Sequence, residues 1–209
     1  MYVRNSMTTN PYTVAPDATI ADALDLMRNK NIKRLPVVKN DELVGIITHS
    51  QLLEVSPSPA TSLSVFEINY LLAKTTIENI MTKKVITVSP ETLLEEASLL
   101  MRKYKIGGLP VLQNKELVGI ITETDVFDAF IEIMGFRDKG ARITVDVGTD
   151  HPGVLAEVTG IIASFNVNIT HIAAFRSELI VRINTSNIKE IVEAIEKQGY
   201  KVISIVKND

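Results

Sequence analysis

Two short stretches of this sequence place hydroxyl groups and a carboxylate or an amide at the start of a helix. In residues 119–125 (Gly-Ile-Ile-Thr-Glu-Thr-Asp), an apolar run typical of a buried strand leads to Thr122, and Asp125 follows three residues later. That spacing is typical of a capping box, with the helix beginning directly after the strand. A helix start aims free backbone N–H groups at one point and favours an anion there, while the Asp125 carboxylate can accept hydrogen bonds from hydroxyl groups. The stretch therefore indicates a site for a hydroxylated, anionic ligand.

The second stretch is residues 45–51 (Gly-Ile-Ile-Thr-His-Ser-Gln), which has the same frame with Gln51 in place of the acid. It belongs to an internal repeat with an offset of 74 residues and no gap. The offset superposes Met7-Thr8 on Met81-Thr82, Leu-Pro-Val at 35–37 on 109–111, and residues 42–48 on 116–122 residue for residue. Two copies of one fold are therefore expected.

Each copy predicts the same order of elements. A short strand (residues 12–14 and 86–88) precedes a proline and then a helix, and two strands joined by a polar turn lead to a closing helix. In the first copy the strands are expected at 35–38 and 43–48, with the turn at 40–41; the second turn falls at 114–115 and the last helix at about 124–134, ended by Gly135. The helical apolar positions are Ile20, Ala23, Leu24 and Met27, and Leu94, Ala97, Leu100 and Met101. A unit this small buries too little surface alone, so we expect the copies to pack together.

The pattern changes from Arg142 onward. Ile143, Val145 and Val147 alternate with polar residues, which indicates a half-buried strand. A helix opening at Asp-His-Pro-Gly-Val-Leu (150–155), strands near 169–175 and 179–184, a second helix ended by Gly199 and a strand at 202–206 complete a ferredoxin-like βαββαβ order. The apolar faces of the two helices are expected to be Leu155, Val158, Ile161, Ile162 and Phe165, and Ile188, Ile191, Val192 and Ile195.

The repeated Met-Thr, Leu-Pro-Val and Gly-Ile-Ile-Thr-x-x-Asp motifs resemble a tandem pair of CBS domains, the Bateman module. The Asp-x-Pro-Gly-x-Leu loop, with Asn168-Ile169 at the next strand, resembles an ACT domain. Together they resemble the acetoin-utilisation regulator family, B component. The resemblance implies an α+β fold with CBS units at 1–60 and 80–136, a linker helix at 61–79, and an ACT domain at 140–209.

In CBS pairs the cleft between the copies commonly binds adenosine-containing ligands, and each pocket combines the Thr-x-x-Asp turn of one copy with strands of the other. Carried onto this sequence, the resemblance implies an adenine nucleotide site (AMP, ADP or ATP) formed by Thr122, Thr124, Asp125, Tyr12, Lys33 and Arg34. The carboxylate would bind ribose hydroxyls and the two cations phosphate. The reciprocal pocket would join Thr48, Ser50 and Gln51 to Ile86, Gly107 and Gly108, without a carboxylate or a cation. We therefore expect one good nucleotide site rather than two. The alternative is that the Thr and Asp or Gln pairs are only capping boxes.

ACT domains are often regulated by amino acids, so the resemblance implies an amino-acid-like effector site. Its residues would be Asp150, His151, Gly153, Val154, Leu155 and Asn168 of the same or a neighbouring subunit. Helix capping explains the loop equally well, because Asp is a good N-cap, Pro suits a first turn and Gly permits an unusual backbone angle. If no effector binds, the unit is better interpreted as a dimerisation element.

Composition excludes several classes of function. A net charge of −3 argues against nucleic acid or an anionic membrane as the main partner. The chain has no cysteine, and its three histidines (His49, His151, His171) have no ligand spacing to one another, so we expect no metal site. No apolar run approaches the roughly 20 residues of a membrane span, and the N-terminus lacks the apolar core of a signal peptide, which favours a cytoplasmic location. No catalytic triad or carboxylate pair can be assigned, so we expect no enzyme.

Two functions remain open. The first is a regulator that senses an adenine nucleotide and passes the signal to a partner protein. The second is an interaction scaffold whose pockets are vestigial. In either case we expect a homodimer, because a four-stranded ACT sheet has exposed edges. A Pro- and Ser-rich loop at 55–62 leads to a helical apolar stripe (Val65, Ile68, Leu71, Leu72), which is either a connector packed on the module or a docking surface.

Overall fold

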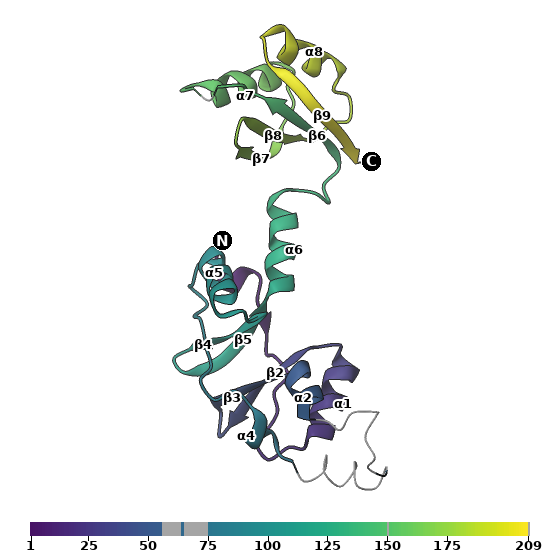
Figure 1. Ribbon diagram of the computed structural model, residues 1–209. Coiled ribbons are helices and arrows are strands. Elements are labelled where there is room, and N and C mark those ends of the chain that lie inside the picture. The colour runs from purple at the N-terminus through teal and green to yellow at the C-terminus, as the bar shows by residue number, and fades with distance from the viewer. Residues whose placement is uncertain (56–63, 65–74, 150, 209) are drawn as a thin grey trace. The chain divides into compact units, whose positions relative to one another are not determined.

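The computed structural model describes residues 1–55, 64, 75–149 and 151–208 (Figure 1). Contacts divide the chain into two units, Met1–Val126 and Phe127–Asp209. The first unit contains the internal repeat and the second contains the βαββαβ segment. Most of the predicted linker helix, including its apolar stripe at Val65, Ile68, Leu71 and Leu72, lies outside the described residues.

Both repeats contain a helix, a β-hairpin and a closing helix. The first repeat has α1 (Ile20–Lys30), β2 (Arg34–Lys39), β3 (Glu42–Thr48) and α2 (His49–Val55). The second has α5 (Leu94–Tyr104), β4 (Gly108–Gln113), β5 (Glu116–Thr122) and α6 (Glu123–Ile133). The short elements η1 (Val3–Asn5) and β1 (Thr8–Thr9) precede the first repeat, and α4 (Ile77–Ile80) precedes the second (Figure 1).

The repeats pack by exchanging their N-terminal segments. Thr8 pairs with Ile120 of β5, and the equivalent Thr82 pairs with Ile46 of β3. The bridge between Tyr2 and Leu93 and the bridge between Thr76 and Thr19 are also equivalent to each other under the offset of 74 residues. Each repeat therefore completes the sheet of the other, as expected for units that are too small to be stable alone.

Two-residue turns fix the register of both hairpins. Asn40 and Asp41 have φ values of 50° and 65°, and the equivalent Asn114 and Lys115 have 51° and 73°. Positive φ at both positions is typical of a type I′ turn, whose twist matches that of the flanking strands. Because both hairpins close identically, the strands β3 and β5 deliver their terminal threonines to equivalent places. These threonines start the helices α2 and α6.

The cores of the two repeats use equivalent residues. The fully or almost fully buried pairs are Ile20 and Leu94, Ala23 and Ala97, Met27 and Met101, Leu35 and Leu109, Val37 and Val111, and Ile47 and Ile121. The helical positions predicted from periodicity therefore face the core as expected.

The strands predicted at 12–14 and 86–88 are wrong in extent. Only Val14 and Val88 pair, each through a single parallel bridge, to Val37 and Val111. The reason lies in the partner strands: Pro36 and Pro110 offer a carbonyl to these valines, at 3.1 Å in both cases, but no N–H with which a longer ladder could continue.

The second unit is an antiparallel four-stranded sheet with the order β7-β8-β6-β9. Its elements are β6 (Gly140–Asp146), α7 (Val154–Ser164), β7 (Ile169–Phe175), β8 (Glu178–Ile183), α8 (Lys189–Lys197) and β9 (Lys201–Asn208). The two helices cover one face of the sheet (Figure 1), and a single core lies between them and the strands. This order is the ferredoxin-like arrangement, so the predicted α+β fold class is confirmed for both units.

The start of α7 differs from the prediction. The helix begins at Val154, and its N-cap is Gly153 with a φ of 101°, rather than an aspartate with Pro152 in the first turn. Leu155 is 48% exposed, so its assignment to the apolar face is wrong. Val158 and Ile162 are buried. Leu155 lies near the helical face of Ile162, seven residues later, but it is in the first turn of α7, whereas the buried part of that face begins only at Val158.

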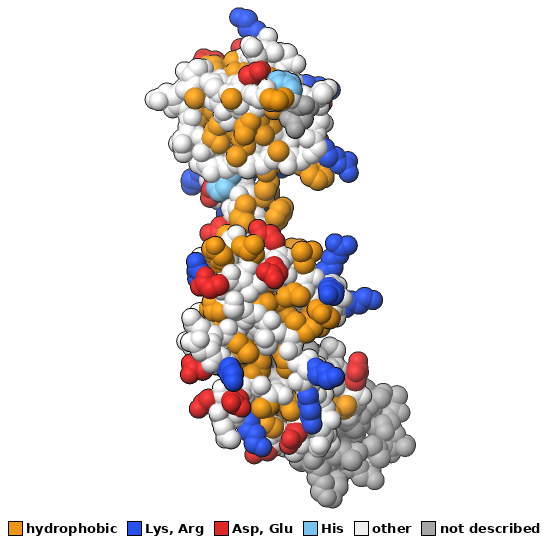
Figure 2. Space-filling model, turned by 90° about the vertical axis from the view of Figure 1, so that its left-hand side faces the viewer, with side chains coloured by type: hydrophobic (Ala, Val, Ile, Leu, Met, Phe, Trp, Pro, Cys, Tyr) orange, Lys and Arg blue, Asp and Glu red, His pale blue; other side chains and the backbone are white. Residues whose placement is uncertain are grey.

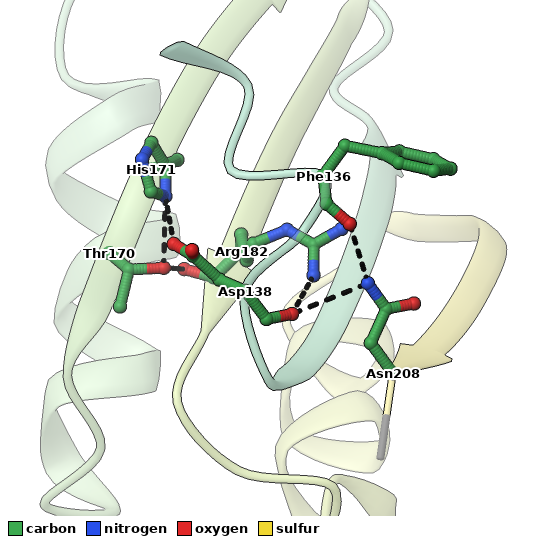
Figure 3. Close-up of polar contacts among 6 residues, drawn as sticks. All are labelled: Phe136, Asp138, Thr170, His171, Arg182 and Asn208. Atoms are coloured by element: carbon green, nitrogen blue, oxygen red, sulfur yellow. Dashed lines mark hydrogen bonds and ion pairs between the residues drawn. The ribbon is translucent and has the colours of Figure 1, made fainter. Parts of the chain in front are cut away.

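Polar contacts attach the segment after α6 to the C-terminal sheet (Figure 3). Arg182 of β8 donates from Nη1 to the carbonyl of Asp138 at 3.0 Å, and Asn208 of β9 donates to the carbonyl of Phe136 at 2.7 Å. His171 of β7 lies 3.3 Å from the Asp138 carboxylate. Arg182 is 1% exposed, and its Nε and Nη2 have no hydrogen-bond partner among the described residues. Helix α6 therefore begins at the Thr122 turn of the second repeat and ends in a segment tied to the second unit.

Candidate functional site

Two clefts lie between the repeats of the first unit. The Asp125 cleft, of about 850 Å³, is lined by first-repeat residues from Thr8 to Tyr12 and from Asn31 to Arg34, and by second-repeat residues from Thr122 to Asp125. All six residues predicted for the nucleotide site line it: Tyr12, Lys33, Arg34, Thr122, Thr124 and Asp125. The Gln51 cleft, of about 770 Å³, contains Thr48, Ser50, Gln51, Ile86, Gly107 and Gly108, the residues predicted for the reciprocal pocket.

Asp125 combines capping with an available acceptor. Its Oδ2 accepts hydrogen bonds from the backbone N–H and the hydroxyl of Thr122, both at 2.7 Å, and its own N–H donates to Thr122 Oγ1 at 3.4 Å. The capping interpretation is therefore correct as geometry. However, no hydrogen bond from the described residues reaches Oδ1, so this oxygen can still accept from a ligand.

Gln51 forms the equivalent capping box, which occupies both lone pairs of its amide oxygen and, among the described residues, uses one of the two N–H groups of Nε2. Its Oε1 accepts from the N–H and hydroxyl of Thr48 at 3.0 and 2.9 Å. Its Nε2 donates to Thr82 Oγ1 of the other repeat at 3.0 Å. Gln51 therefore serves to join the repeats, and only the Asp125 cleft offers a carboxylate oxygen to a ribose.

The Arg34 side chain of the first repeat lies over two glycines of the second. Gly107 and Gly108 occupy the positions equivalent to Lys33 and Arg34. A Cβ on Gly107 would lie 2.5 Å from Arg34 Nη2 and 2.9 Å from Glu123 Oε2. The missing side chain thus makes the space that the guanidinium fills. Partial burial lowers the pKa of Arg34, and the carboxylates of Glu123 and Asp125 oppose that shift. Because the ordinary pKa of arginine lies far above neutral, the guanidinium stays charged near neutral pH.

The backbone N–H groups that were expected to bind an anion at the start of α6 are mostly hydrogen-bonded within the protein. The N–H of Thr122 donates to Asp125, that of Glu123 donates to the carbonyl of Gly107 at 3.2 Å, and that of Asp125 donates to Thr122. The residues around the start of α6 pack closely enough to accept hydrogen bonds from these backbone N–H groups. The positive charge at this cleft is therefore supplied by Lys33 and Arg34 rather than by the helix terminus.

The expectation that the Gln51 cleft lacks cations is wrong. Lys33, Arg34, Lys84 and Lys105 line it, together with His49, whereas none of its described lining residues is an acid. Sequence reasoning missed this because it placed Lys33 and Arg34 only in the Asp125 pocket and assigned Lys84 and Lys105 to neither pocket. The exchange of Lys33 and Arg34 with Gly107 and Gly108 at equivalent positions is the signal that could have revealed it, because opposite glycines let long side chains reach both clefts.

Tyr12 supplies an aromatic surface at the Asp125 cleft. It is 50% exposed, and Lys30 Nζ lies 4.8 Å from the centre of its ring. An exposed ring at the cleft is available to pack against a nucleobase. The equivalent residue in the Gln51 cleft is Ile86.

The predicted effector residues of the C-terminal unit lie at its surface. His151, Gly153 and Leu155 are exposed, Val154 is half-buried, and Asp150 lies outside the described residues. Asn168 is also exposed, and its backbone N–H and carbonyl pair with Asn184 at 3.2 Å each. Gly153 leaves open space where a Cβ would be, with only Glu157 Oε1 at 4.0 Å.

Two kinds of feature are absent from the described part of the chain, a metal site and a membrane-spanning helix. No group of three or more His, Asp or Glu side chains there could hold a metal ion. Across residues 1–55, 75–149 and 151–208, none of the helices has both the length and the apolar character needed to span a bilayer.

Comparison with known families agrees with this architecture. The CBS domain family matches residues 3–58 and 77–132, and the ACT domain family matches residues 141–200. The chain is 32% identical over 180 residues to inosine-5'-monophosphate dehydrogenase from Korarchaeum cryptofilum, a match that covers 86% of this chain and 34% of the dehydrogenase. It thus spans about a third of that relative. It is 34% identical over 134 residues to a CBS domain-containing protein from Dictyostelium discoideum, covering 63% of this chain and 92% of that one.

Solved structures extend the comparison. A protein from Vibrio cholerae assigned to acetoin utilization (AcuB) is 31% identical with a TM-score of 0.55, covering 66% of this chain and 95% of that one. The CBS pair of MJ0100, in complex with 5'-methylthioadenosine and S-adenosyl-L-methionine, is 30% identical with a TM-score of 0.52, covering 62% and 95%. CBSX2 in complex with AMP is 30% identical with a TM-score of 0.53, covering 63% and 97%. This chain belongs to the CBS domain family, as a tandem CBS pair followed by an ACT domain, and is similar to the acetoin utilization protein AcuB.

Proposed function

We propose that this protein is a non-catalytic regulator that binds an adenine nucleotide in the Asp125 cleft and passes the signal to a partner protein, in the manner of the acetoin-utilisation type. The observation that carries the proposal is the composition of that cleft. It joins a carboxylate oxygen without a partner among the described residues, an exposed tyrosine ring and two cations, contributed by two different repeats. These groups match the ribose, base and phosphate of AMP, ADP or ATP.

Two further observations support this reading. CBS pairs about 30% identical to this chain have been solved with AMP and with adenosine derivatives. In addition, Asp125 lies in the first turn of α6, whose chain continues into the segment tied to the ACT sheet. A ligand that engages Asp125 would act directly on the element that leads to the second unit.

Thermal unfolding of the full chain with a panel of ligands tests the proposal. A ligand at 100 times its dissociation constant stabilises the folded state by about 2.7 kcal/mol. We expect stabilisation by at least one of AMP, ADP, ATP and S-adenosylmethionine, and none by GMP at equal concentration. Absence of any shift, followed by absence of heat in calorimetry, would favour the alternative function, an interaction scaffold with vestigial pockets.

For the ACT domain we propose an amino-acid-like effector at the loop before α7. The site would combine Asp150, His151, Gly153, Val154 and Leu155 with Asn168, and the space open at Gly153 would let a ligand approach the backbone. Calorimetry against the common amino acids tests this site. If none binds, the domain acts in dimerisation.

A homodimer is the assembly that we propose. Apolar side chains reach the surface on α6, where Phe127, Phe130 and Ile133 are 67%, 62% and 51% exposed (Figure 2). The strands β7 and β9 leave both edges of the ACT sheet unpaired among the described residues. Light scattering should give the mass of a dimer at micromolar concentration, and a monomer there would exclude this assembly.

A further inference from the structure

The two clefts between the repeats differ in charge at equivalent positions. The Asp125 cleft has Asp125, Glu123, Asn10 and Asn31, whereas the Gln51 cleft has Gln51, His49, Lys84 and Lys105. Each of these four exchanges removes negative charge from the Gln51 cleft or adds positive charge to it. The exchange of Lys33 and Arg34 for Gly107 and Gly108 runs the other way, but both cations also line the Gln51 cleft, so the lining of that cleft is the more positive of the two.

The contents of the Gln51 cleft match a polyvalent anion. Lys84 and Lys105 line this cleft alone, Lys33 and Arg34 line both clefts, and none of the described lining residues of the Gln51 cleft is an acid. Gln51 offers no acceptor to ribose hydroxyls, because its Oε1 already accepts two hydrogen bonds within the protein. Lysines without an acid beside them in a concave site are groups that bind phosphate.

The two clefts also share their central residues. Lys33, Arg34 and Gly107 line both of them. The Arg34 side chain lies across Gly107 and Gly108, where a Cβ on Gly108 would be 2.9 Å from Arg34 Cδ. One guanidinium thus stands between the two sites, so an anion bound in one of them competes with, or extends into, the other.

We propose that the Gln51 cleft is a polyphosphate site, coupled through Arg34 to nucleoside binding in the Asp125 cleft. This inference rests on the proposed function and deepens it, because it makes nucleoside di- and triphosphates the preferred ligands over AMP and adenosine. The polyphosphate comes from the tail of a nucleotide whose ribose is held by Asp125, or from a separate phosphate compound. Both sources use the same lysines.

The repeat itself supplies the test variant. Lys84→Asn with Lys105→Asn gives the Gln51 cleft the residues of its twin, and Asn at position 105 suits the left-handed backbone there, with a φ of 54°. The control is Lys39→Asn with Lys115→Asn, which removes the same charge from hairpin positions that line neither cleft. All four lysines are exposed, so both variants should fold, as circular dichroism would verify.

Calorimetry with adenosine, AMP, ATP and inorganic tripolyphosphate provides the readout. We expect wild-type affinity to rise from adenosine to AMP to ATP. The Lys84/Lys105 variant should weaken ATP and tripolyphosphate by about tenfold or more, since charge-assisted hydrogen bonds are lost, while adenosine changes less than about threefold. The control should leave all four within about twofold, because exposed charges outside the site act weakly.

The same titrations distinguish the two sources of the polyphosphate, and they test this inference separately from the proposed function. If the tail of a bound nucleotide fills the Gln51 cleft, ATP blocks tripolyphosphate, whereas saturating adenosine leaves tripolyphosphate binding intact. If ATP and tripolyphosphate bind together, the site takes a separate phosphate compound. Equal affinity for AMP and ATP with no effect of the Lys84/Lys105 variant overturns the inference and leaves the proposed function standing. Tripolyphosphate binding without any adenosine or AMP binding overturns the proposed function alone.

Discussion

Asp125 performs two tasks, and the repeat provides a substitution that separates them. Asp125→Gln makes the second turn chemically equivalent to the first, where Gln51 already forms the capping box with bonds of 2.9 and 3.0 Å. The variant should therefore retain the start of α6 but lose the carboxylate. Asp125→Ala removes both and should cost an additional 0.5–2 kcal/mol of stability, about the value of an N-terminal cap.

The expected loss of binding follows from the free oxygen. A hydrogen bond to a charged group contributes about 1.5–3 kcal/mol, which corresponds to a factor of about 10 to 150 in affinity. Asp125→Gln should thus weaken adenosine and AMP by at least about tenfold with a thermal midpoint close to that of wild type. Gln51→Ala is the reciprocal control: it should lower the midpoint, because it loses the bond to Thr82, but leave AMP affinity nearly unchanged.

Calorimetry and ligand-free thermal unfolding of the four proteins measure these quantities separately. Equal weakening by Asp125→Ala and Gln51→Ala, or wild-type affinity in Asp125→Gln, would refute the assignment of the nucleoside to the Asp125 cleft. If nucleotide affinity falls in proportion to the loss of stability across these variants, helix capping alone explains the role of Asp125.

Other predictions concern charge and packing. Arg34→Ala should weaken the binding of ATP and AMP more than that of adenosine in calorimetry. Gly107→Ala should have the same effect, because the new Cβ would lie 2.5 Å from Arg34 Nη2 and displace the guanidinium. An equal loss of adenosine affinity would contradict both predictions. Arg182→Met should leave the unfolding midpoint unchanged or raise it, because the buried guanidinium has two unpartnered nitrogens; a loss above about 3 kcal/mol would show that the charge is compensated. Hydrogen bonds from Thr19 lower the pKa of Asp22. This stabilisation is present above the ordinary carboxyl pKa and lost as pH falls below about 4, so Asp22→Asn should flatten the acid limb of the stability curve, and an unchanged limb would exclude that role.

Much of the fold follows from local sequence signals in this chain. The offset of 74 residues predicted two equivalent folds, and apolar spacing identified Ile20, Ala23 and Met27 as core residues, all of which are buried. The failures arise where tertiary context decides. Whether residues 12–14 extend into a strand depends on Pro36 of the neighbouring strand, and the exposure of Leu155 depends on how far along α7 the core extends.

The candidate site shows the same division. The six residues predicted for the nucleotide cleft do line one cleft, because the repeat and the resemblance together specify which strand faces which turn. The reach of Arg34 into the second cleft could not be derived from its own repeat. It depends on the absence of side chains at Gly107 and Gly108, a property of the packed pair rather than of either copy.

The identity of β3 and β5 has a consequence for folding. Both strands read Glu-Leu-Val-Gly-Ile-Ile-Thr, and each receives a Met-Thr segment whose methionine packs on the glycine of the strand, Met7 on Gly119 and Met81 on Gly45. A Met-Thr segment therefore finds chemically equal partners within its own molecule and in any neighbouring one. Concentrated refolding should partition between pairing within one chain and domain-swapped pairing between chains. Swapped and unswapped forms would contain the same strand contacts, and the slow exchange of swapped chains on dilution would distinguish them.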